Sequence, residues 1–219
     1  MFPKQVQLWA RRLAERLVKP LAPSGLTPNA VTVVGFILNI LTAVILASGH
    51  LSIGGIFLFV SGLFDLLDGA LARVTGQHSD FGAFLDSILD RYSEAAILLA
   101  LIYVFTIHGE TAQVLLVYIV AIGSIMISYA RARAGALRID CKVGIAPRPE
   151  RVLILGFGLL LSGFLGHATT TVAALIILAL LTHITAMQRL HYVWRQTEGQ
   201  KNPGSSAQPS TKARESRIS

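Results

Sequence analysis

Charged residues are scarce in this chain of 219 residues. They make up 14% of the sequence, whereas about a quarter is usual for a water-soluble domain. Hydrophobic residues account for 53%, and the mean hydropathy is +0.61. This balance excludes an ordinary soluble domain. The excess apolar residues form six long runs, at residues 31–49, 53–72, 84–108, 112–130, 152–166 and 170–187.

Most of these runs are long enough to cross a membrane, because a helix of roughly 20 apolar residues spans the hydrocarbon core. The run at 152–166 is shorter, and we expect its helix to begin earlier, within residues 147–151. The sequence therefore predicts an all-α integral membrane protein with six transmembrane helices. The single cysteine, Cys141, leaves no partner for a disulfide within the chain.

Lysine and arginine are absent from three of the predicted connections, which lie near residues 50, 108–111 and 166–169. All 19 basic residues fall near the termini, after the fourth run, or in the turn region between the second and third predicted helices, which holds Arg73 and Arg91. Because basic loops stay in the cytoplasm, we predict a multi-pass protein of the cell membrane with both termini, and the turn between the second and third runs, on the cytoplasmic side. The net charge of +7 then reflects topology and attraction to anionic membrane lipids, and no nucleic-acid partner is expected.

The two ends of the chain have patterns of their own. Apolar residues recur at helical spacing within residues 1–22, at Val6, Trp9, Leu13 and Leu17. Basic residues occupy the opposite face, which predicts an interfacial amphipathic helix in the headgroup plane. Residues 199–219 are polar and rich in proline and serine, which predicts a disordered cytoplasmic tail. Residues 1–198 then form a single membrane domain.

Aspartates are the least expected residues in so apolar a chain. Asp65 and Asp68 stand three residues apart, and Asp86 and Asp90 stand four apart, so each pair lies on one helix face. A short turn joins the two helices, which therefore run antiparallel and bring the pairs to similar depth. Four carboxylates at membrane depth need a cationic partner. Oxygen ligands without histidine or cysteine suit hard divalent ions such as Mg²⁺, Mn²⁺ or Ca²⁺.

Spacing alone leaves two other interpretations open. The aspartates could pair with Arg73 and Arg91, or they could form an ion or proton pathway in a transporter. A transporter usually has two related halves with broken helices at corresponding positions. In this sequence no convincing internal repeat is found, and the acidic residues gather at one end of one helix pair.

The same stretch resembles the signature of the CDP-alcohol phosphotransferases. Every fixed position of that signature is matched, by Asp65, Asp68, Gly69, Ala72, Arg73, Gly82, Asp86 and Asp90. The resemblance implies a homodimer of six-span subunits that binds two divalent ions, Mg²⁺ or Mn²⁺, in each active site. It also implies an enzyme that moves a phosphatidyl or archaetidyl group from CDP-diacylglycerol, or from its ether-lipid analogue, to an alcohol and releases CMP. Because the aspartates lie near the cytoplasmic turn, we expect the active site on the cytoplasmic side.

The resemblance also implies roles for individual residues. Asp65, Asp68 and Asp86 correspond to metal ligands. Asp90 corresponds to a residue that both contacts metal and takes the proton from the attacking hydroxyl. The family positions that hold the CDP-lipid correspond to Asn29, Thr32, Gly69, Arg73 and Ser79. Helix capping is the competing interpretation for the asparagine, threonine and serine, and cytoplasmic anchoring is the competing interpretation for the arginine.

The signature does not name the acceptor alcohol, but a second group of arginines offers a clue. The segments SYARARA, RPER and MQRL resemble the subfamily that uses inositol phosphate. Their arginines correspond to an acceptor-phosphate site formed by Arg131, Arg151 and Arg189, with Arg133 and Arg148 as further candidates. Guanidinium groups suit an acceptor that itself carries phosphate. Glycerol 3-phosphate is the competing acceptor because it also carries one.

Overall fold

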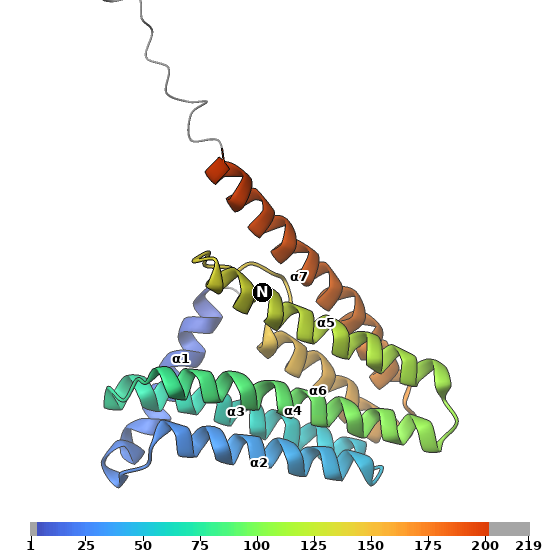
Figure 1. The fold of residues 1–219 in the computed structure, drawn as a ribbon. Coiled ribbons are helices and arrows are strands. Elements are labelled where there is room, and N and C mark those ends of the chain that lie inside the picture. The colour runs from blue at the N-terminus through green and yellow to red at the C-terminus, as the bar shows by residue number, and fades with distance from the viewer. Residues whose placement is uncertain (1–3, 202–219) are drawn as a thin grey trace, which may run out of the picture.

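Helices make up the whole ordered framework of the computed structural model, which describes residues 4–201 (Figure 1). In chain order they are α1 (Lys4–Val18), the 3-10 helix η1 (Lys19–Ser24), α2 (Pro28–Ala47), α3 (Leu51–Thr75), α4 (Asp80–Ile107), α5 (Thr111–Ala136), α6 (Arg148–Leu165) and α7 (Thr169–Lys201). No strand occurs in this part of the chain. The all-α prediction is therefore confirmed, and α2 to α7 correspond to the six apolar runs.

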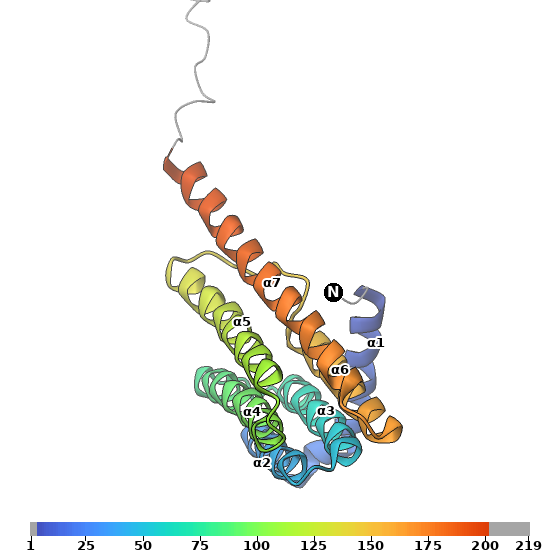
Figure 2. The ribbon, with the colours of Figure 1, turned by 90° about the vertical axis from the view of Figure 1, so that its right-hand side faces the viewer.

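The six long helices form a closed ring of contacts. Going around it, the order is α2, α3, α6, α7, α5 and α4, and α4 packs in turn against α2. Figure 2 looks along several of these helices and shows the same order. Within the described residues, α3 and α4 are therefore not direct neighbours, although only a short turn joins them. The sides of α3 and α4 that carry the aspartates instead face each other across the interior of the ring.

Local signals in the sequence explain where the helices at one end of the ring begin and stop. Thr27 caps α2 by accepting a hydrogen bond from the backbone N–H of Ala30 (3.3 Å). Helix α3 stops at Gly76, whose φ of 68° suits glycine. Ser79 caps α4 through the N–H of Gly82 (2.9 Å). Helix α6 begins at Arg148, earlier than its apolar run, as predicted.

Within residues 4–201, four helices are long and apolar enough to cross a membrane. They are α2, α3, α5 and the Thr169–Glu198 part of α7. These helices indicate a multi-pass membrane protein. The other two helices of the ring fall short for visible reasons, since α6 has 18 residues and begins with charged side chains, and the first half of α4 carries the aspartates. The prediction of six spans is thus met in part.

The two ends of the described chain extend the bundle in different directions. Helix α1 lies crosswise at the end of the bundle where α2 begins and α3 ends (Figure 1). It buries Ala14 and Val18 against the α3 side and leaves Trp9 66% exposed. Helix α7 projects beyond the other helices and ends at Lys201, inside the segment 199–219 for which disorder was predicted. Residues 202–219 lie outside the described part.

Glycine allows α3 and α6 to approach closely. A Cβ atom built on Gly55 would lie 2.9 Å from the backbone nitrogen of Leu160 and 3.0 Å from the carbonyl oxygen of Gly156. Neither backbone atom can turn away as a side chain could. This contact therefore fixes the distance at which α6 packs on α3.

Replacing Gly55 with alanine should lower the thermal unfolding midpoint by several degrees, because overpacking a tight contact costs about 1–3 kcal/mol. The matched control is Gly135→Ala in α5, where an added Cβ meets nothing within 4 Å. That change should be neutral or slightly stabilising, since alanine favours a helix. Equal midpoints for the two variants in detergent would contradict the close approach of α3 and α6.

Candidate active site

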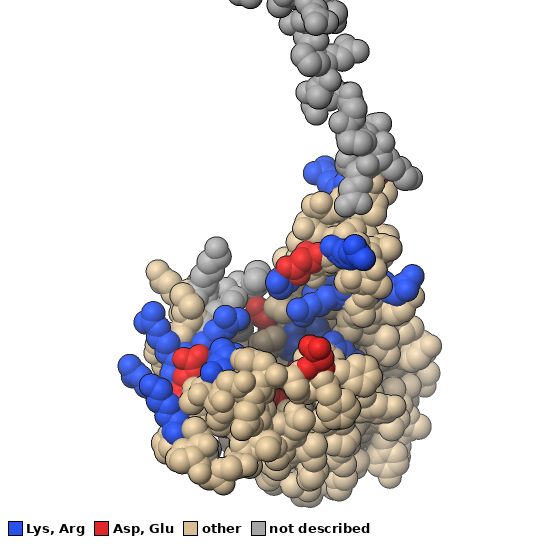
Figure 3. All heavy atoms as spheres, turned by 60° about the vertical axis from the view of Figure 1, so that its left-hand side comes forward, with Lys and Arg blue, Asp and Glu red and all other residues tan. Residues whose placement is uncertain are grey.

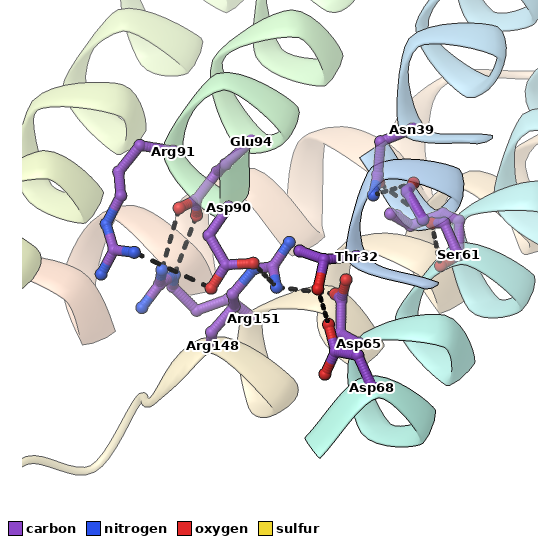
Figure 4. A network of polar contacts seen from close by, with 12 residues as sticks. Thr32, Asn39, Ser61, Asp65, Asp68, Asp90, Arg91, Glu94, Arg148 and Arg151 are labelled. Carbon is purple, nitrogen blue, oxygen red and sulfur yellow. Dashed lines mark hydrogen bonds and ion pairs between the residues drawn. The ribbon is translucent and has the colours of Figure 1, made fainter. Parts of the chain in front are cut away.

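The aspartates lie where three helices come together at one end of the bundle. Asp65 and Asp68 belong to the last turns of α3, and Asp86 and Asp90 belong to the first turns of α4. The N-terminal end of α6 faces both helices, and its arginines reach between them (Figure 4). In the space-filling view, lysine and arginine side chains surround a hollow on this part of the molecule (Figure 3).

Arg148 is the central cation of the cluster. Its Nη1 donates to Oδ2 of Asp65 at 2.6 Å and also forms an ion pair with Oδ1 of Asp90. One guanidinium group on α6 therefore links α3 to α4. Asp86 interacts electrostatically with Asp65 and Asp90, so the pairs lie at similar depth, as predicted.

Spacing alone left open that the aspartates pair with Arg73 and Arg91, and the structure contains only a weak form of that pairing. Arg91 lies 3.8 Å from Oδ2 of Asp90, at the outer limit for an ion pair. Arg73 donates instead to Glu15 of α1 at 3.0 Å. The internal cation is thus Arg148, which the sequence suggested only as a candidate for the acceptor phosphate.

Asp68 has a different environment from the other three aspartates. The hydroxyl of Thr32 on α2 donates to its Oδ2 at 2.8 Å, and both side chains are buried. Gly35 lets α2 lie close at this depth, because an added Cβ would stand 3.2 Å from Cβ of Phe64. Thr32, expected to contact the CDP-lipid, is thereby placed beside an expected metal ligand.

The remaining residues expected to contact the CDP-lipid fall in two places. Asn29 lies beside the start of α4, where a Cβ added to Gly82 would come within 2.7 Å of its Oδ1 and 2.9 Å of the hydroxyl oxygen of Ser79. Gly69 lies beside Arg73, whose Nη1 would stand 3.5 Å from an added Cβ. The structure therefore brings Asn29 and Ser79 together, and it explains glycine at position 82 by a close approach of side chains.

Arg151 of α6 forms a two-point ion pair deeper in the bundle. Its Nε and Nη2 donate to the two carboxylate oxygens of Glu94, each at 2.9 Å, and its Nη1 donates to the carbonyl of Ala146 at 3.1 Å. Only 5% of Arg151 is exposed. Both residues line a cavity in the interior of the ring, to which Asp65 and Arg148 also contribute.

Arg189 of α7 is fixed by backbone groups. Its Nε donates to the carbonyl of Val143 (3.0 Å), and its Nη1 donates to that of Ile127 (2.6 Å). Arg131 and Arg151 are both close enough to interact with it electrostatically. The three arginines expected at the acceptor phosphate therefore gather on one side of the site. Arg133 is exposed on α5.

The donor set suits a hard divalent cation. Asp65, Asp86 and Asp90 interact with one positive group, the guanidinium of Arg148, and Asp68 interacts with Asp65 and Asp86. In residues 4–201, no three acidic, histidine or cysteine side chains adopt a ligating arrangement around a single point. The carboxylates and their charge fit such an ion, and those of Asp65 and Asp90 turn toward the arginine in this structure.

Comparisons with known proteins identify the family. The profile described as CDP-alcohol phosphatidyltransferase matches residues 25–195, which include every helix of the ring except the end of α7. The chain belongs to the CDP-alcohol phosphatidyltransferase family. It is therefore an enzyme of phospholipid synthesis, and this membership decides against the transporter interpretation.

Two curated relatives make the similarity more specific. The chain is 40% identical over 188 residues to the archaetidylinositol phosphate synthase of Methanothermobacter thermautotrophicus, covering 85% of this chain and 93% of that protein. It is 35% identical over 192 residues to the phosphatidylinositol phosphate synthase of Mycobacteroides abscessus, covering 85% and 87%. The arginine segments pointed to the same subfamily.

Solved structures of a phosphatidyltransferase share the fold. The Mycobacterium tuberculosis phosphatidylinositol phosphate synthase with CDP-DAG bound aligns with a TM-score of 0.77 and 32% identity, covering 91% of this chain and 99% of that one. The same enzyme in complex with manganese and citrate also gives 0.77 and 32%, covering 90% and 93%. A relative with this fold therefore binds a CDP-lipid and a divalent metal.

One residue of the site was missed by sequence reasoning. Glu94 stands four residues after Asp90, which itself stands four after Asp86, so all three lie on one face of α4. That spacing was the available signal. It was overlooked because Glu94 falls outside the family signature.

Replacing Arg148 with glutamine should lower the thermal unfolding midpoint in the presence of a chelator by several degrees, because the clustered carboxylates then lack a cation. Added Mn²⁺ should raise the midpoint of this variant more than that of the parent protein, since the guanidinium no longer competes for Asp65 and Asp90. Arg195→Gln, an exposed change of the same charge on α7, is the control. A variant as stable as the parent in chelator would show that Arg148 does not compensate the aspartates.

Proposed function

We propose that this chain transfers a phosphatidyl or archaetidyl group from a CDP-linked lipid to a hydroxyl of inositol phosphate and releases CMP. The observation that carries the proposal is the meeting of two groups at one end of the bundle. Asp65 on α3 and Asp90 on α4 pair with Arg148 of α6, and Arg151 of the same helix lies near Arg189 of α7. The acidic group suits the pyrophosphate end of the donor with its metal, and the arginines suit a phosphorylated acceptor.

The substrate assignment is supported by what the relatives are called. Both curated relatives are inositol phosphate lipid synthases, one for an archaetidyl and one for a phosphatidyl product. CDP-DAG is the ligand of a relative with the same fold. Glycerol 3-phosphate stays the alternative acceptor, because it would engage the same arginines.

The chain's own residues suit the transfer. Asp90 is proposed to accept the proton of the attacking hydroxyl, whose oxygen bonds to the lipid-bearing phosphorus while the bond from that phosphorus to CMP breaks. Asp65, Asp68, Asp86 and Asp90 are the residues that would hold two divalent ions, Mg²⁺ or Mn²⁺. When bound, such ions would neutralise charge on the pyrophosphate and favour departure of CMP.

The binding residues are proposed from their places around the aspartates. Asn29, Thr32, Gly69, Arg73 and Ser79 are proposed to hold the CDP-lipid. Thr32 and Ser79 already make hydrogen bonds that fix their side chains, to Asp68 and to the start of α4 respectively. Such restraint reduces the entropy lost when a ligand binds.

The acceptor phosphate is proposed to bind Arg131, Arg151 and Arg189. Arg148 reaches Asp65 and Asp90, so as a candidate for the acceptor it would lie nearest the reacting hydroxyl. Arg133 is the weaker candidate because it is exposed on α5.

The membrane arrangement is also a proposal. All six helices of the ring are proposed to span the bilayer, with both termini and the aspartates on the cytoplasmic side. The exposed apolar side chains of α1, among them Trp9 and Leu17, suit a helix in the headgroup plane. The chain is proposed to work as a homodimer.

The acceptor assay tests the function directly. Purified protein in lipid or detergent should release CMP from CDP-diacylglycerol or its ether analogue when Mg²⁺ or Mn²⁺ and inositol phosphate are both added. Chelator should abolish the release, and unphosphorylated inositol should be a poor acceptor. Faster release with glycerol 3-phosphate at equal concentration would transfer the assignment to that acceptor. Absence of CMP release with every polar alcohol would overturn the enzymatic proposal.

The aspartates should divide their labour. Asp90→Asn keeps the size of the side chain but removes the base, so turnover should fall by about 10²–10⁴-fold while CDP-lipid still binds. Asp68→Asn should instead weaken binding of the nucleotide together with the metal. Turnover and CDP-lipid binding are measured separately for each variant. Parental turnover in Asp90→Asn would contradict its role as the base.

A further inference from the structure

The ion pair between Glu94 and Arg151 takes no part in the chemistry proposed above. Glu94 lies one helical turn deeper than Asp90 on α4, and Arg151 lies three residues after Arg148 on α6. The two arginines therefore face the acidic side of α4 at successive depths, as Figure 4 shows. Arg148 forms ion pairs with Asp90 and Asp65, whereas Arg151 forms one with Glu94.

The geometry of the pair decides which part of Arg151 stays available. A guanidinium group has five N–H donors arranged in a planar fork. Glu94 accepts from Nε and Nη2, which is one edge of that fork, and the carbonyl of Ala146 accepts from Nη1. Two donors remain, one on Nη1 and one on Nη2. A phosphate can therefore approach Arg151 only from the side that faces away from Glu94.

The neighbourhood explains why this restraint matters. Arg151 and Glu94 line the same cavity as Asp65 and Arg148. Without a carboxylate of its own, the buried guanidinium of Arg151 would be drawn toward Asp90, one turn away on the same helix face as Glu94. The guanidinium would then move away from Arg189, the neighbouring arginine proposed to bind the acceptor phosphate.

We infer that Glu94 is a positioning residue for the acceptor: it holds Arg151 by one edge of the guanidinium, so that the other edge binds the acceptor phosphate. The inference rests on the proposed function and deepens it. Glu94 acts through Arg151 and does not itself touch the reacting atoms. The residue should therefore influence how the phosphorylated alcohol binds and leave CDP-lipid binding nearly unchanged.

The test measures the KM values of both substrates in Glu94→Gln, Arg151→Ala and the double variant. Glu94→Gln should raise the KM for inositol phosphate about tenfold, as expected when a charged hydrogen-bonding group loses its position. The KM for the CDP-lipid should stay within about twofold. In the Arg151→Ala background, Glu94→Gln should add little, because residues that act through one contact are not additive.

Two further variants separate positioning from loss of stability. Ser61→Ala removes a buried hydrogen bond to Asn39 (3.0 Å) in the same cavity, so it should lower the unfolding midpoint without changing the KM for the acceptor. Glu94→Asp keeps the charge and should show a smaller rise in that KM than Glu94→Gln. It also supplies the measurement if Glu94→Gln does not fold. Protection of the protein against thermal unfolding by inositol phosphate gives a readout that needs no turnover, and it should weaken in Glu94→Gln.

The possible outcomes are distinct. If the parent protein releases no CMP with inositol phosphate, the proposed function fails. If the parent is active and Arg151→Ala raises the acceptor KM while Glu94→Gln leaves it unchanged or lowers it, the inference about Glu94 is wrong. Equal rises in both KM values, or fully additive effects in the double variant, would assign Glu94 a merely structural role and would also overturn the inference.

Discussion

The need to compensate clustered carboxylates inside a membrane bundle is the constraint on which the rest of this structure depends. Burying an ion without a partner costs several kcal/mol, and this site gathers four aspartates and Glu94. Helix α6 supplies the compensation by placing Arg148 and Arg151 opposite the acidic face of α4. Because α3 and α4 are not neighbours in the ring, the contact of Arg148 with Asp65 and Asp90 is what joins their acidic faces across the interior.

That constraint connects packing to chemistry. The arginines reach the aspartates only if the start of α6 lies close to α3. Gly62 permits this approach, because a Cβ added there would stand 3.3 Å from Cγ1 of Val152, near the start of α6. The segment just before α6 is also held from the side of α7, where the N–H of Ala146 donates to the hydroxyl of Thr185 at 3.1 Å. A helix held on both sides presents its two arginines at fixed depths. The polar site is therefore positioned by apolar and backbone contacts that bear no charge.

Hydropathy and spacing were enough to predict the six helices, the antiparallel pair and the depth of Asp65 and Asp90, because these features depend on residues close together in the sequence. The partners of the aspartates could not be predicted in this way. Arg148 is 83 residues away from Asp65, and their contact depends on the order of helices in the ring. Spacing left Arg73 open as a partner of the aspartates, yet the structure pairs it with Glu15. For Glu94, the spacing after Asp90 could have predicted its place on the acidic face of α4, but its pairing with Arg151 could not be predicted from the sequence.

The internal bonds of the arginines bear on the choice of acceptor. Any phosphorylated alcohol can satisfy the remaining donors of Arg151 and Arg189, so charge alone does not distinguish inositol phosphate from glycerol 3-phosphate. In the proposed site, the distinction would depend on the span between Arg151 and Asp90, whose side chains are held by ion pairs to Glu94 and Arg148 respectively. The inositol ring keeps its phosphate and hydroxyl groups at a fixed separation, whereas the glycerol chain must lose conformational freedom to present both groups. The proposed acceptor site, with both ends rigidly held, would therefore favour inositol phosphate over glycerol 3-phosphate.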